Sequence, residues 1–424
     1  MVKPGYKQTQ VGIIPDDWKC QVINDEIIEI SMGPFGSDIP VSCFTTEGVP
    51  VLNGQSVSQI TLKDEFKNFV TAEKAKSLKK AVAVRGDIVV THRGTIGQIS
   101  YVPQTSRYEK YVISQSQFRI RLNPITVNPH FVVAYFLSPK GQEVLLEKKG
   151  HTGVPALAQP TTNFRKLCIP LPPLHEQRHI VLALSEIDEL LFSLEVSLTK
   201  KKAIKQGAMQ ELLTGKKRLP GFSGEWATKT LNEISCEIVD GPFGSNLKKE
   251  HYTAERQVRI IQLSNIGETG WNDSNTKYTT FAHAAGLSRC IVQPGAVLIA
   301  KMMPAGRAII CPNKEKGYIL GSDVVKVVPN DTVDSSYLVY ATKSPFYLDQ
   351  IADDTQGSTR TRTSVSKLRK TSILFPSKDE QVAIATVLSN MDSEIEALQQ
   401  KLEKYRQLKQ GMMQQLLTGK IRLI

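Results

Sequence analysis

The sequence predicts an α+β protein with two globular α/β domains, related by a pseudo-two-fold axis and separated by two long helices that form an antiparallel coiled coil. Three observations support this fold class. The segment Lys205–Lys216 returns nearly unchanged as Lys409–Lys420, and the pentapeptide Gly33–Ser37 is identical to Gly241–Ser245. Each copy of the longer segment also closes a run of apolar residues at seven-residue spacing, which is typical of paired helices.

The two halves share one order of elements, which predicts domain boundaries at 1–174, 175–217, 218–377 and 378–424. The first and third segments are the globular domains, and the second and fourth are the helices. In each domain the pentapeptide predicts a tight turn after a strand. In the first domain we then expect strands at Ala81–Val84, Asp87–Val90 and Phe118–Leu122, a short helix at Phe131–Leu145, a polar loop at Gly150–Pro160 and an exit strand at Ile169–Pro173. In the second domain we expect strands at Ala296–Ala300 and Asp323–Val328, a short helix at Tyr337–Ile351, a polar loop at Gln356–Thr363 and an exit strand at Ile373–Pro376.

Both long helices carry start and stop signals. Ser377–Glu380 has the spacing of a capping box, and Glu176 stands at the equivalent place in the first helix. Each helix is followed by a glycine, Gly215 or Gly419, that can end it in the left-handed conformation. The heptad positions are expected to form a buried seam of Leu184, Ile187, Leu191, Leu194, Leu198, Lys201, Lys205, Ala208 and Leu212 against Leu388, Met391, Ile395, Leu398, Leu402, Tyr405, Lys409, Met412 and Leu416.

The order of charges in the helices predicts that they pair antiparallel. Acidic residues precede basic ones in both helices, as Asp188 precedes Lys205 and Asp392 precedes Lys409. Antiparallel packing sets the acidic part of one helix beside the basic part of the other, whereas parallel packing sets like charges together. The second helix then returns to the first domain, so the C-terminal residues are expected close to the N-terminus.

Composition narrows the class of protein. The 424 residues carry a formal net charge of +12, which favours a polyanionic partner such as nucleic acid. The six cysteines are scattered, form no C-x-x-C pair and indicate a reducing compartment. No secretory signal and no apolar run long enough to span a bilayer is present, so a cytoplasmic location is expected.

The sequence contains no convincing catalytic constellation. It has no phosphate-binding loop of the G-x-x-x-x-G-K-[ST] type, which argues against ATP hydrolysis. Asn128–Phe131 resembles the N-P-P-F signature of adenine methyltransferases, but the second proline is missing, and a helix cap explains the segment better. His175 and His179 have helical spacing but no further ligands, which indicates surface residues. We therefore predict a non-catalytic chain that binds no metal and no cofactor of its own.

Two loops at equivalent places in the repeats differ completely at their tips. They are 92–98 in the first domain and 301–307 in the second, and Gly97 and Gly306 are equivalent frame residues. One scaffold with two different tips is what reading two different DNA sequences requires. Side chains able to contact bases or phosphates define the predicted DNA-binding set: Ser37, His92, Arg93, Gln98, Arg107, His151, Thr152, Ser245, Lys301, Arg307, Ser358, Thr359, Arg360 and Arg362.

The chain as a whole resembles the DNA-specificity (S) subunits of type I restriction-modification enzymes. The resemblance rests on Ile169–Gln177 before the first long helix, on the doubled Leu-Leu-Thr-Gly-Lys, on the opening Tyr6–Trp18 and on the order domain, helix, domain, helix. The second copy of the first motif, Phe375–Gln381, departs from the pattern and keeps only Pro376, Glu380 and Gln381.

The resemblance implies a division of labour. Each globular domain would be a target recognition domain that reads one half of a split, asymmetric site in double-stranded DNA. The helices would set the half-site spacing and dock two modification (methyltransferase) subunits, which restriction (motor-nuclease) subunits join. S-adenosylmethionine, ATP and magnesium would belong to those partners, and no membrane is involved.

Two other classes of protein make different predictions. A stand-alone DNA methyltransferase or nuclease with two DNA-binding domains would modify or cut DNA without partner subunits. A coiled-coil scaffold without a nucleic-acid role would show no salt-dependent DNA binding.

Overall fold

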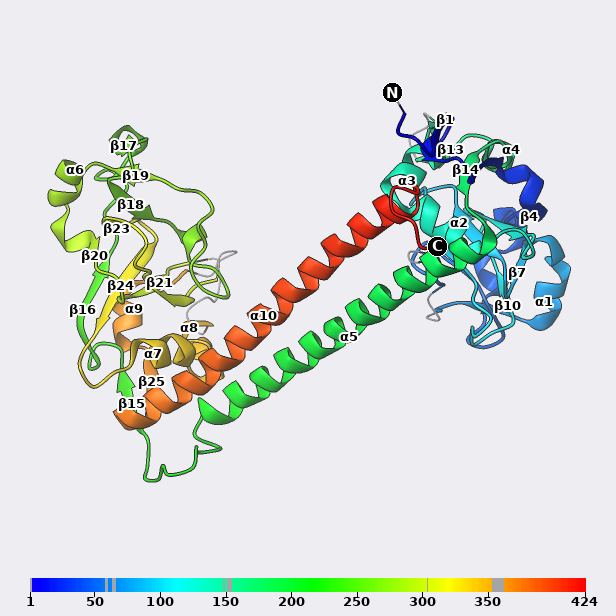
Figure 1. The fold of residues 1–424 in the computed structure, drawn as a ribbon. Coiled ribbons are helices and arrows are strands. Elements are labelled where there is room, and N and C mark those ends of the chain that lie inside the picture. The colour runs from blue at the N-terminus through cyan, green and yellow to red at the C-terminus, as the bar shows by residue number, and fades with distance from the viewer. Residues whose placement is uncertain are drawn as a thin grey trace. The chain divides into compact units, whose positions relative to one another are not determined.

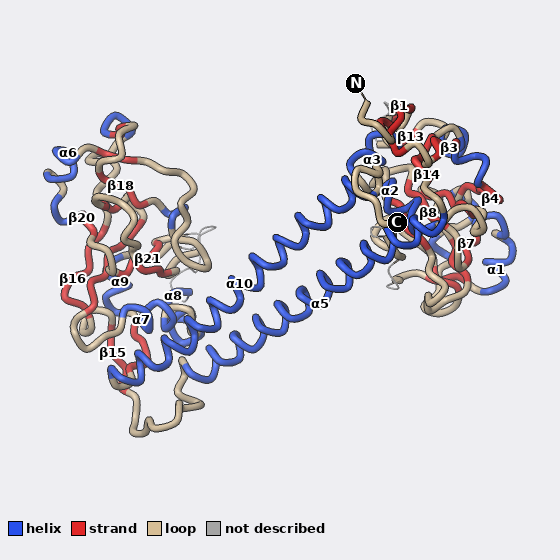
Figure 2. The backbone as a smooth tube through the Cα atoms, viewed as in Figure 1, coloured by secondary structure: helices blue, strands red, loops and turns tan. Residues whose placement is uncertain are grey.

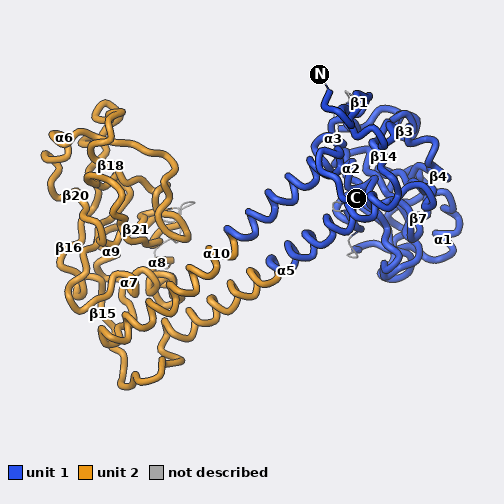
Figure 3. The backbone as a smooth tube through the Cα atoms, viewed as in Figure 1, with its two compact units in different colours: residues 1–195, 400–424 blue, residues 196–399 orange. Residues whose placement is uncertain are grey.

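The computed structural model describes residues 2–57, 60–62, 66–147, 149–150, 155–302, 304–352 and 362–424. The chain divides into two compact units, residues 1–195 with 400–424 (unit 1) and residues 196–399 (unit 2), as Figure 3 shows. Each unit therefore contains one globular part and a segment of both long helices. None of the described helices has a stretch long and apolar enough to cross a membrane.

A four-stranded antiparallel sheet organises unit 1, with the strand order β4-β11-β8-β9. Its strands are β4 (Ile27–Met32), β11 (Gln117–Leu122), β8 (Ile88–Thr91) and β9 (Ile99–Tyr101). Two helices start at prolines after side-chain caps from Asn128 and Ser138, as expected from proline at a first helical position. They are α2 (Pro129–Leu137) and α3 (Pro139–Leu145), labelled in Figure 1. The aromatic residues of α2 belong to the same core cluster as Phe118 of the sheet.

Smaller elements surround this sheet in unit 1. Antiparallel pairs join β1 (Tyr6–Thr9) with β2 (Gly12–Pro15), β3 (Lys19–Val22) with β14 (Cys168–Leu171), β5 (Val49–Pro50) with β6 (Phe69–Val70), β7 (Val82–Val84) with β10 (Lys110–Val112) and β12 (Lys149–Gly150) with β13 (Ala156–Leu157). The short helices are α1 (Ala72–Ser77) and α4 (Pro160–Arg165).

Unit 2 repeats the architecture with the strand order β16-β24-β21-β22. These strands are β16 (Ser235–Asp240), β24 (Val324–Pro329), β21 (Val297–Ala300) and β22 (Ala308–Ile310). The exit strand β25 (Ser372–Phe375) pairs with β15 (Ala227–Thr230), as β14 pairs with β3 in unit 1. The helices of this unit are α6 (Phe281–Ala285), α7 (Ser335–Ala341), α8 (Pro345–Ala352) and α9 (Val365–Lys370).

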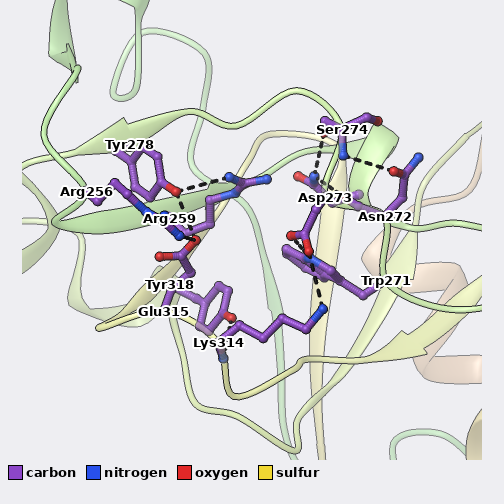
Figure 4. Close-up of polar contacts among 11 residues, drawn as sticks. Arg256, Arg259, Trp271, Asn272, Asp273, Ser274, Tyr278, Lys314, Glu315 and Tyr318 are labelled. Carbon is purple, nitrogen blue, oxygen red and sulfur yellow. Dashed lines mark hydrogen bonds and ion pairs between the residues drawn. The ribbon is translucent and has the colours of Figure 1, made fainter. Parts of the chain in front are cut away.

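Unit 2 also has a five-stranded sheet in the order β17-β19-β18-β23-β20, and Figure 4 shows the polar cluster around it. Its strands are β17 (Tyr252–Thr253), β19 (Tyr278–Thr279), β18 (Val258–Ile261), β23 (Tyr318–Leu320) and β20 (Ile291–Val292). The guanidinium of Arg259, fully buried, lies 5.4 Å from the ring centre of Tyr278 and 6.0 Å from that of Trp271. Such cation–π contacts stabilise a buried charge, so this arginine belongs to the core.

Both long helices are continuous: α5 spans Leu174–Leu212 and α10 spans Lys378–Leu416 (Figure 2). In unit 1, Asp188 pairs with Lys409 at 2.5 Å and Glu195 with Arg406 at 2.7 Å. The residue number increases along α5 from one pair to the next while it decreases along α10, so the helices are antiparallel there. In unit 2, Lys201 pairs with Glu394 and Lys205 with Asp392 in the same direction. The predicted antiparallel coiled coil is confirmed.

The seam prediction is confirmed at nine of its apolar positions, whereas the other apolar positions are half-buried and Lys201 is exposed. Nine of the predicted residues are at most 9% exposed, namely Leu184, Ile187, Leu191, Leu194, Leu212, Leu388, Ile395, Leu402 and Leu416. The predicted lysines of the seam take part in the ion pairs just described. Gly215 and Gly419 follow the helices with φ of +70° each, the left-handed conformation expected of a C-terminal cap.

A buried carboxylate joins each globular part to its helix. In unit 1 the Glu176 side chain accepts a hydrogen bond from Trp18 Nε1 at 3.0 Å and pairs with Arg422 at 2.6 Å. In unit 2 Glu380 accepts from Trp226 Nε1 at 3.0 Å and pairs with Arg218 at 2.5 Å. We call each Trp–Glu–Arg set a joint.

The joints correct the capping-box interpretation. The Ser377 hydroxyl does accept from Glu380 N at 3.4 Å, but the Glu380 carboxylate turns to Trp226 and Arg218 instead of the helix start. An arginine and an indole N–H together satisfy a buried carboxylate better than one backbone amide does. The next residues, Gln177 and Gln381, donate to the carbonyls of Pro172 and Pro376 at 2.8 and 3.0 Å. These contacts give Glu-Gln a structural role in both copies.

The C-terminal tail reaches the N-terminal segment within unit 1, as the charge order predicted. Tyr6 Oη donates to the carbonyl of Gly419 at 3.1 Å, and Arg422 pairs with Asp17 at 2.7 Å. This contact with Arg422 lowers the pKa of Asp17 below its usual 3.8.

Candidate nucleic-acid interface

Two loops meet at one end of the four-stranded sheet in unit 1. One follows β4 and contains Gly33–Ser37 (the shared loop, with 241–245 as its copy), and the other joins β8 to β9 (the tip loop, 92–98, with 301–307 as its copy). Gly33 N donates to the carbonyl of Gln117 at 2.8 Å, and His92 N donates to the carbonyl of Ser116 at 2.8 Å. The start of β11 therefore holds both loops side by side.

The same arrangement recurs in unit 2. Gly241 N donates to the carbonyl of Val324 at 3.0 Å, and Lys301 N donates to the carbonyl of Asp323 at 2.9 Å. The central strand, here β24, again lies between the strand that leads into the shared loop and the strand that leads into the tip loop. Both units thus present equivalent loops at the same end of equivalent sheets.

The predicted polar loop joins this site in both units. In unit 1, Leu157 N donates to the carbonyl of His92 at 2.8 Å, and in unit 2, Thr363 N donates to the carbonyl of Lys301 at 2.8 Å. The structure therefore brings together loops that lie about sixty residues apart in the sequence.

A glycine fixes the shape of each tip loop. Gly97 and Gly306 have φ of +85° and +83°, which favour glycine. A Cβ at Gly306 would lie 3.0 Å from Ile351 and 3.1 Å from Tyr347, and one at Gly97 would lie 3.1 Å from Leu146. The frame of the loop is therefore the same in both units, although the tip sequences differ.

The tip loop of unit 1 presents one exposed charge and two partly buried polar groups. Arg93 is exposed, whereas His92 is half-buried with Nε2 3.3 Å from the carbonyl of Gln115. Burial lowers the pKa of His92 below its usual 6.5. The side-chain amide of Gln98 lies beside the carbonyl of Gly54 and donates to it at 2.7 Å in the orientation that places its nitrogen on that side. Arg93 is thus the residue of this tip best placed to meet a ligand.

The tip loop of unit 2 borders a cavity of about 860 Å³. Lys301 and Arg362 line it, and both are partly neutralised, since Lys301 Nζ lies 2.7 Å from Asp240 Oδ1 and Arg362 Nη2 lies 2.9 Å from Asp323 Oδ1. The Lys301 side chain is 9% exposed and that of Arg362 is 57% exposed. Arg362 is therefore the more accessible of the two cations.

The remaining predicted residues fall into three groups. Ser37 and Ser245 are exposed in the shared loops, and Arg307 is half-buried at the end of its tip loop. Arg107 is exposed after β9, in a segment that leaves the sheet at the end opposite to the tip loop, so the sheet does not bring it to the other residues. His151, Thr152, Ser358, Thr359 and Arg360 lie outside the described residues.

Other basic residues of the sheets are paired with acidic residues of the same unit. In unit 1, Asp87 is fully buried and lies 3.3 Å from Arg119 Nη1 and 2.7 Å from Arg121 Nε. In unit 2, Lys326 Nζ lies 2.9 Å from Glu237. Because these basic side chains already have acidic partners, they stabilise the sheets and are not free to bind DNA.

Sequence reasoning missed the acidic residues of the interface. Asp240 and Asp323 hold Lys301 and Arg362, and neither carboxylate belonged to the predicted set. A signal was present for Asp240, because it directly precedes the shared pentapeptide of the second copy. For the joints, the signal was the equal offset of Glu176 from Glu380 and of Arg218 from Arg422. Among the described residues, no group of three or more His, Cys, Asp or Glu side chains is arranged to hold a metal ion.

Comparison with known proteins agrees with this duplicated geometry. The family model described as "Type I restriction modification DNA specificity domain" matches residues 15–206 and again residues 224–405, which together exceed half of the chain. The two matches correspond to the two copies of the repeat.

Relatives and solved structures cover nearly the whole chain. The putative type I restriction enzyme MjaX specificity subunit of Methanocaldococcus jannaschii is 23% identical over 99% of this chain and 97% of its own length. The MjaVIII specificity subunit of the same organism is 24% identical over 68% and 69%. The S subunit of a type I restriction-modification system from M. genitalium is 16% identical, has a TM-score of 0.57 and covers 94% of this chain and 96% of that one. A chain from a type I R-M complex reaches a TM-score of 0.60 at 18% identity, covering 96% and 99%. The structural matches show the same fold.

Proposed function

Because the chain belongs to the type I restriction-modification DNA specificity family and is a DNA sequence-specificity subunit, we propose that each of its units reads one half of a bipartite, asymmetric DNA site. The observation that best supports this proposal is that the two units have equivalent interfaces. Both place a shared loop, a tip loop and a polar loop at the same end of the same sheet, yet the tips begin with His92-Arg93 in unit 1 and with Lys301-Met302 in unit 2. Equal frames with unequal tips suit two different half-sites.

Within each interface, the exposure of the side chains ranks the residues that could read bases. Arg93 in unit 1 and Arg362 in unit 2 are exposed, and an arginine can bind a guanine edge with two hydrogen bonds. Lys301 is more buried and tied to Asp240, so its main role is to hold the tip loop against β16. These assignments make the two arginines the main specificity residues of the described interface.

The helices serve spacing and assembly in this proposal. The two long helices set the distance between the half-sites that the two units read. They also offer equivalent docking places to two modification subunits, which restriction subunits then join. In this proposal the chain itself is non-catalytic, and S-adenosylmethionine, ATP and magnesium are bound by the partner subunits. This proposed role implies that the complex lies in the cytoplasm, where it meets DNA.

Binding experiments with the purified chain and its modification subunits test the proposal. Arg93→Ala and Arg362→Ala should each relax the sequence preference at one half-site and cost about 1–3 kcal/mol in binding the cognate site. The other half-site should keep its sequence in each variant. Methyl transfer by the purified chain alone would contradict the proposal and favour a stand-alone methyltransferase.

A further inference from the structure

We propose that Phe35 and Phe243 contact DNA at two equivalent places without reading its sequence. Each phenyl ring would pack against sugar or base faces of the duplex beside its half-site. The inference rests on the proposed function and adds a second kind of DNA contact to it, one shared by both units.

The exposure of these two rings is the first argument. Phe35 is 82% exposed and Phe243 is 83% exposed, although the chain buries Phe118, Phe131 and Phe136 completely. Single apolar residues on a surface are ordinary. Here, however, the same large apolar residue stands at the same exposed place in both copies, within a pentapeptide that is identical in both. Burial within the chain explains neither ring.

The shared loop holds each ring outward on a fixed backbone. A Cβ at Gly33 would collide with the carbonyl of Ser114, and one at Gly241 with that of Gly321, so both glycines lie against backbone. Phe35 N donates to Asp38 Oδ2 at 3.2 Å, which ties the loop to itself. A ring presented by an ordered loop loses little entropy when it binds a partner.

The turn after the ring is also equivalent in the two units. Asp38 N donates to the carbonyl of Phe35 at 2.9 Å, and Asn246 N donates to the carbonyl of Phe243 at 2.8 Å. The preceding prolines, Pro34 and Pro242, are buried. Both rings therefore leave the sheet from the same backbone geometry.

The surroundings of the rings favour DNA as the occupant. Phe243 lines the same cavity as Arg362, so the exposed ring stands beside the cation that the proposed function assigns to DNA in unit 2. In unit 1, Gly36 of the shared loop lies against the Gln115 side chain, and the Gln115 carbonyl contacts His92 of the tip loop. A ligand that reaches the tip loop is thus adjacent to the ring in both units.

The identity of the rings indicates a contact that is independent of sequence. A phenyl ring has neither a donor nor an acceptor with which to distinguish base edges. The same residue faces two half-sites that differ, so it can contribute only to what the half-sites have in common. Apolar side chains make such contacts by packing on sugars, stacking on bases or wedging into a base step.

The test compares Phe35→Ala, Phe243→Ala and the double variant with wild type, all as the full chain assembled with its modification subunits. Each single variant should weaken binding roughly 5- to 100-fold, as loss of an aromatic contact to nucleic acid does. Cognate and unrelated DNA should be affected by the same factor, so the ratio between them stays constant. The slope of affinity against salt should also stay constant, because no phosphate contact is lost.

Matched variants separate this role from a structural one. Ile125 is 78% exposed beyond the opposite end of β11, so Ile125→Ala removes an equally exposed apolar side chain away from the interface and should leave DNA binding unchanged. Phe35→Trp and Phe243→Trp keep an aromatic face and should retain most of the affinity.

Three results would overturn the inference. They are unchanged DNA affinity in the double variant, a loss confined to the cognate sequence, and a loss of modification-subunit assembly with DNA contacts intact, which would assign the rings to that partner. If wild type itself fails to prefer any DNA sequence, the proposed function fails instead, and that result is seen before any variant is compared.

Discussion

The two units agree in how they are built and differ in what they present. Each joint uses a tryptophan, a buried glutamate and an arginine, with indole-to-carboxylate distances of 3.0 Å in both units. The tip loops share a left-handed glycine but no tip sequence. The residues of the joints and the left-handed tip glycines are therefore the same in both units, whereas the tip sequences differ. The comparison teaches that duplication supplied one frame and that function diverged at its tips.

Breaking a joint should have the largest effect, and the effect should be similar in both units. Glu176→Ala and Glu380→Ala each leave an arginine and a tryptophan N–H without their buried carboxylate. Loss of one member of a buried pair costs about 3–5 kcal/mol, and the partial exposure of Arg422 and Arg218 puts the expected cost near the lower limit. Urea unfolding measures the loss. A cost below about 1 kcal/mol in either variant would show that the joint behaves as a surface ion pair.

The tip glycines should show a smaller effect, and a control within unit 1 separates its two causes. Gly97→Ala forces a side chain into the left-handed region, which costs about 1–2 kcal/mol, and brings its Cβ to 2.7 Å from Gln142 Oε1 of α3 and 3.1 Å from Leu146. Gly94 has a similar φ of +84° but open space around a Cβ, so Gly94→Ala should show the conformational cost alone. Thermal unfolding compares the two. Equal losses would mean that packing against α3 contributes nothing.

Acid should distinguish the two tips. The pKa of His92 is lowered by burial, so its neutral form is favoured in the folded state; its contribution to stability is present above pH 6.5 and is lost as pH falls through the lower folded value. The equivalent residue in unit 2 is Lys301, so the tip loop of that unit has no histidine at this position. The fall in Tm below pH 6.5 should therefore be smaller in His92→Asn than in wild type. A fall of the same size in both would show that His92 is not the titrating group.

The helix ion pairs should have the smallest effects. Lys205 and Asp392 have side chains 16% and 40% exposed, whereas Lys201 and Glu394 are 45% and 55% exposed. Exposed pairs contribute about 0–1 kcal/mol, so Lys201→Met should be nearly neutral and Lys205→Met slightly destabilising. Added salt should reduce the difference in denaturation midpoint. A larger cost at Lys201 than at Lys205 would contradict this ranking.

The sequence allowed the fold to be predicted where local patterns repeat. Leucine spacing located the buried seam, and the order of charges predicted the antiparallel pairing in which acidic residues such as Asp188 meet basic residues such as Lys409. The joints could not be predicted in the same way, because Glu176 and Trp18 lie far apart in sequence and only the packed unit brings them together. Ser377–Glu380 therefore resembled a local cap, although the partners of Glu380 are distant in the chain.

The interface was predicted in outline but not in the roles of its residues. The tip and polar loops were expected to differ between the copies, and the structure brings them together through backbone pairs at His92 and Lys301. Which cations remain accessible depends on carboxylates such as Asp240, and this pairing depends on side-chain positions that no sequence spacing specifies. Phe35 and Phe243 were seen only as parts of a turn, because exposure of a ring cannot be inferred from its neighbours in the chain.

The most direct test of the account is a chimeric chain in which both globular parts have the sequence of unit 2. Replacing residues 1–173 by a copy of 218–377 puts the globular part of unit 2 before both long helices. Mapping methylated adenines genome-wide in a host that carries the chimera and its partner subunits shows which site is recognised. The account predicts a symmetric site made of the unit 2 half-site and its inverted repeat. Retention of the original asymmetric site would contradict the claim that each unit reads one half.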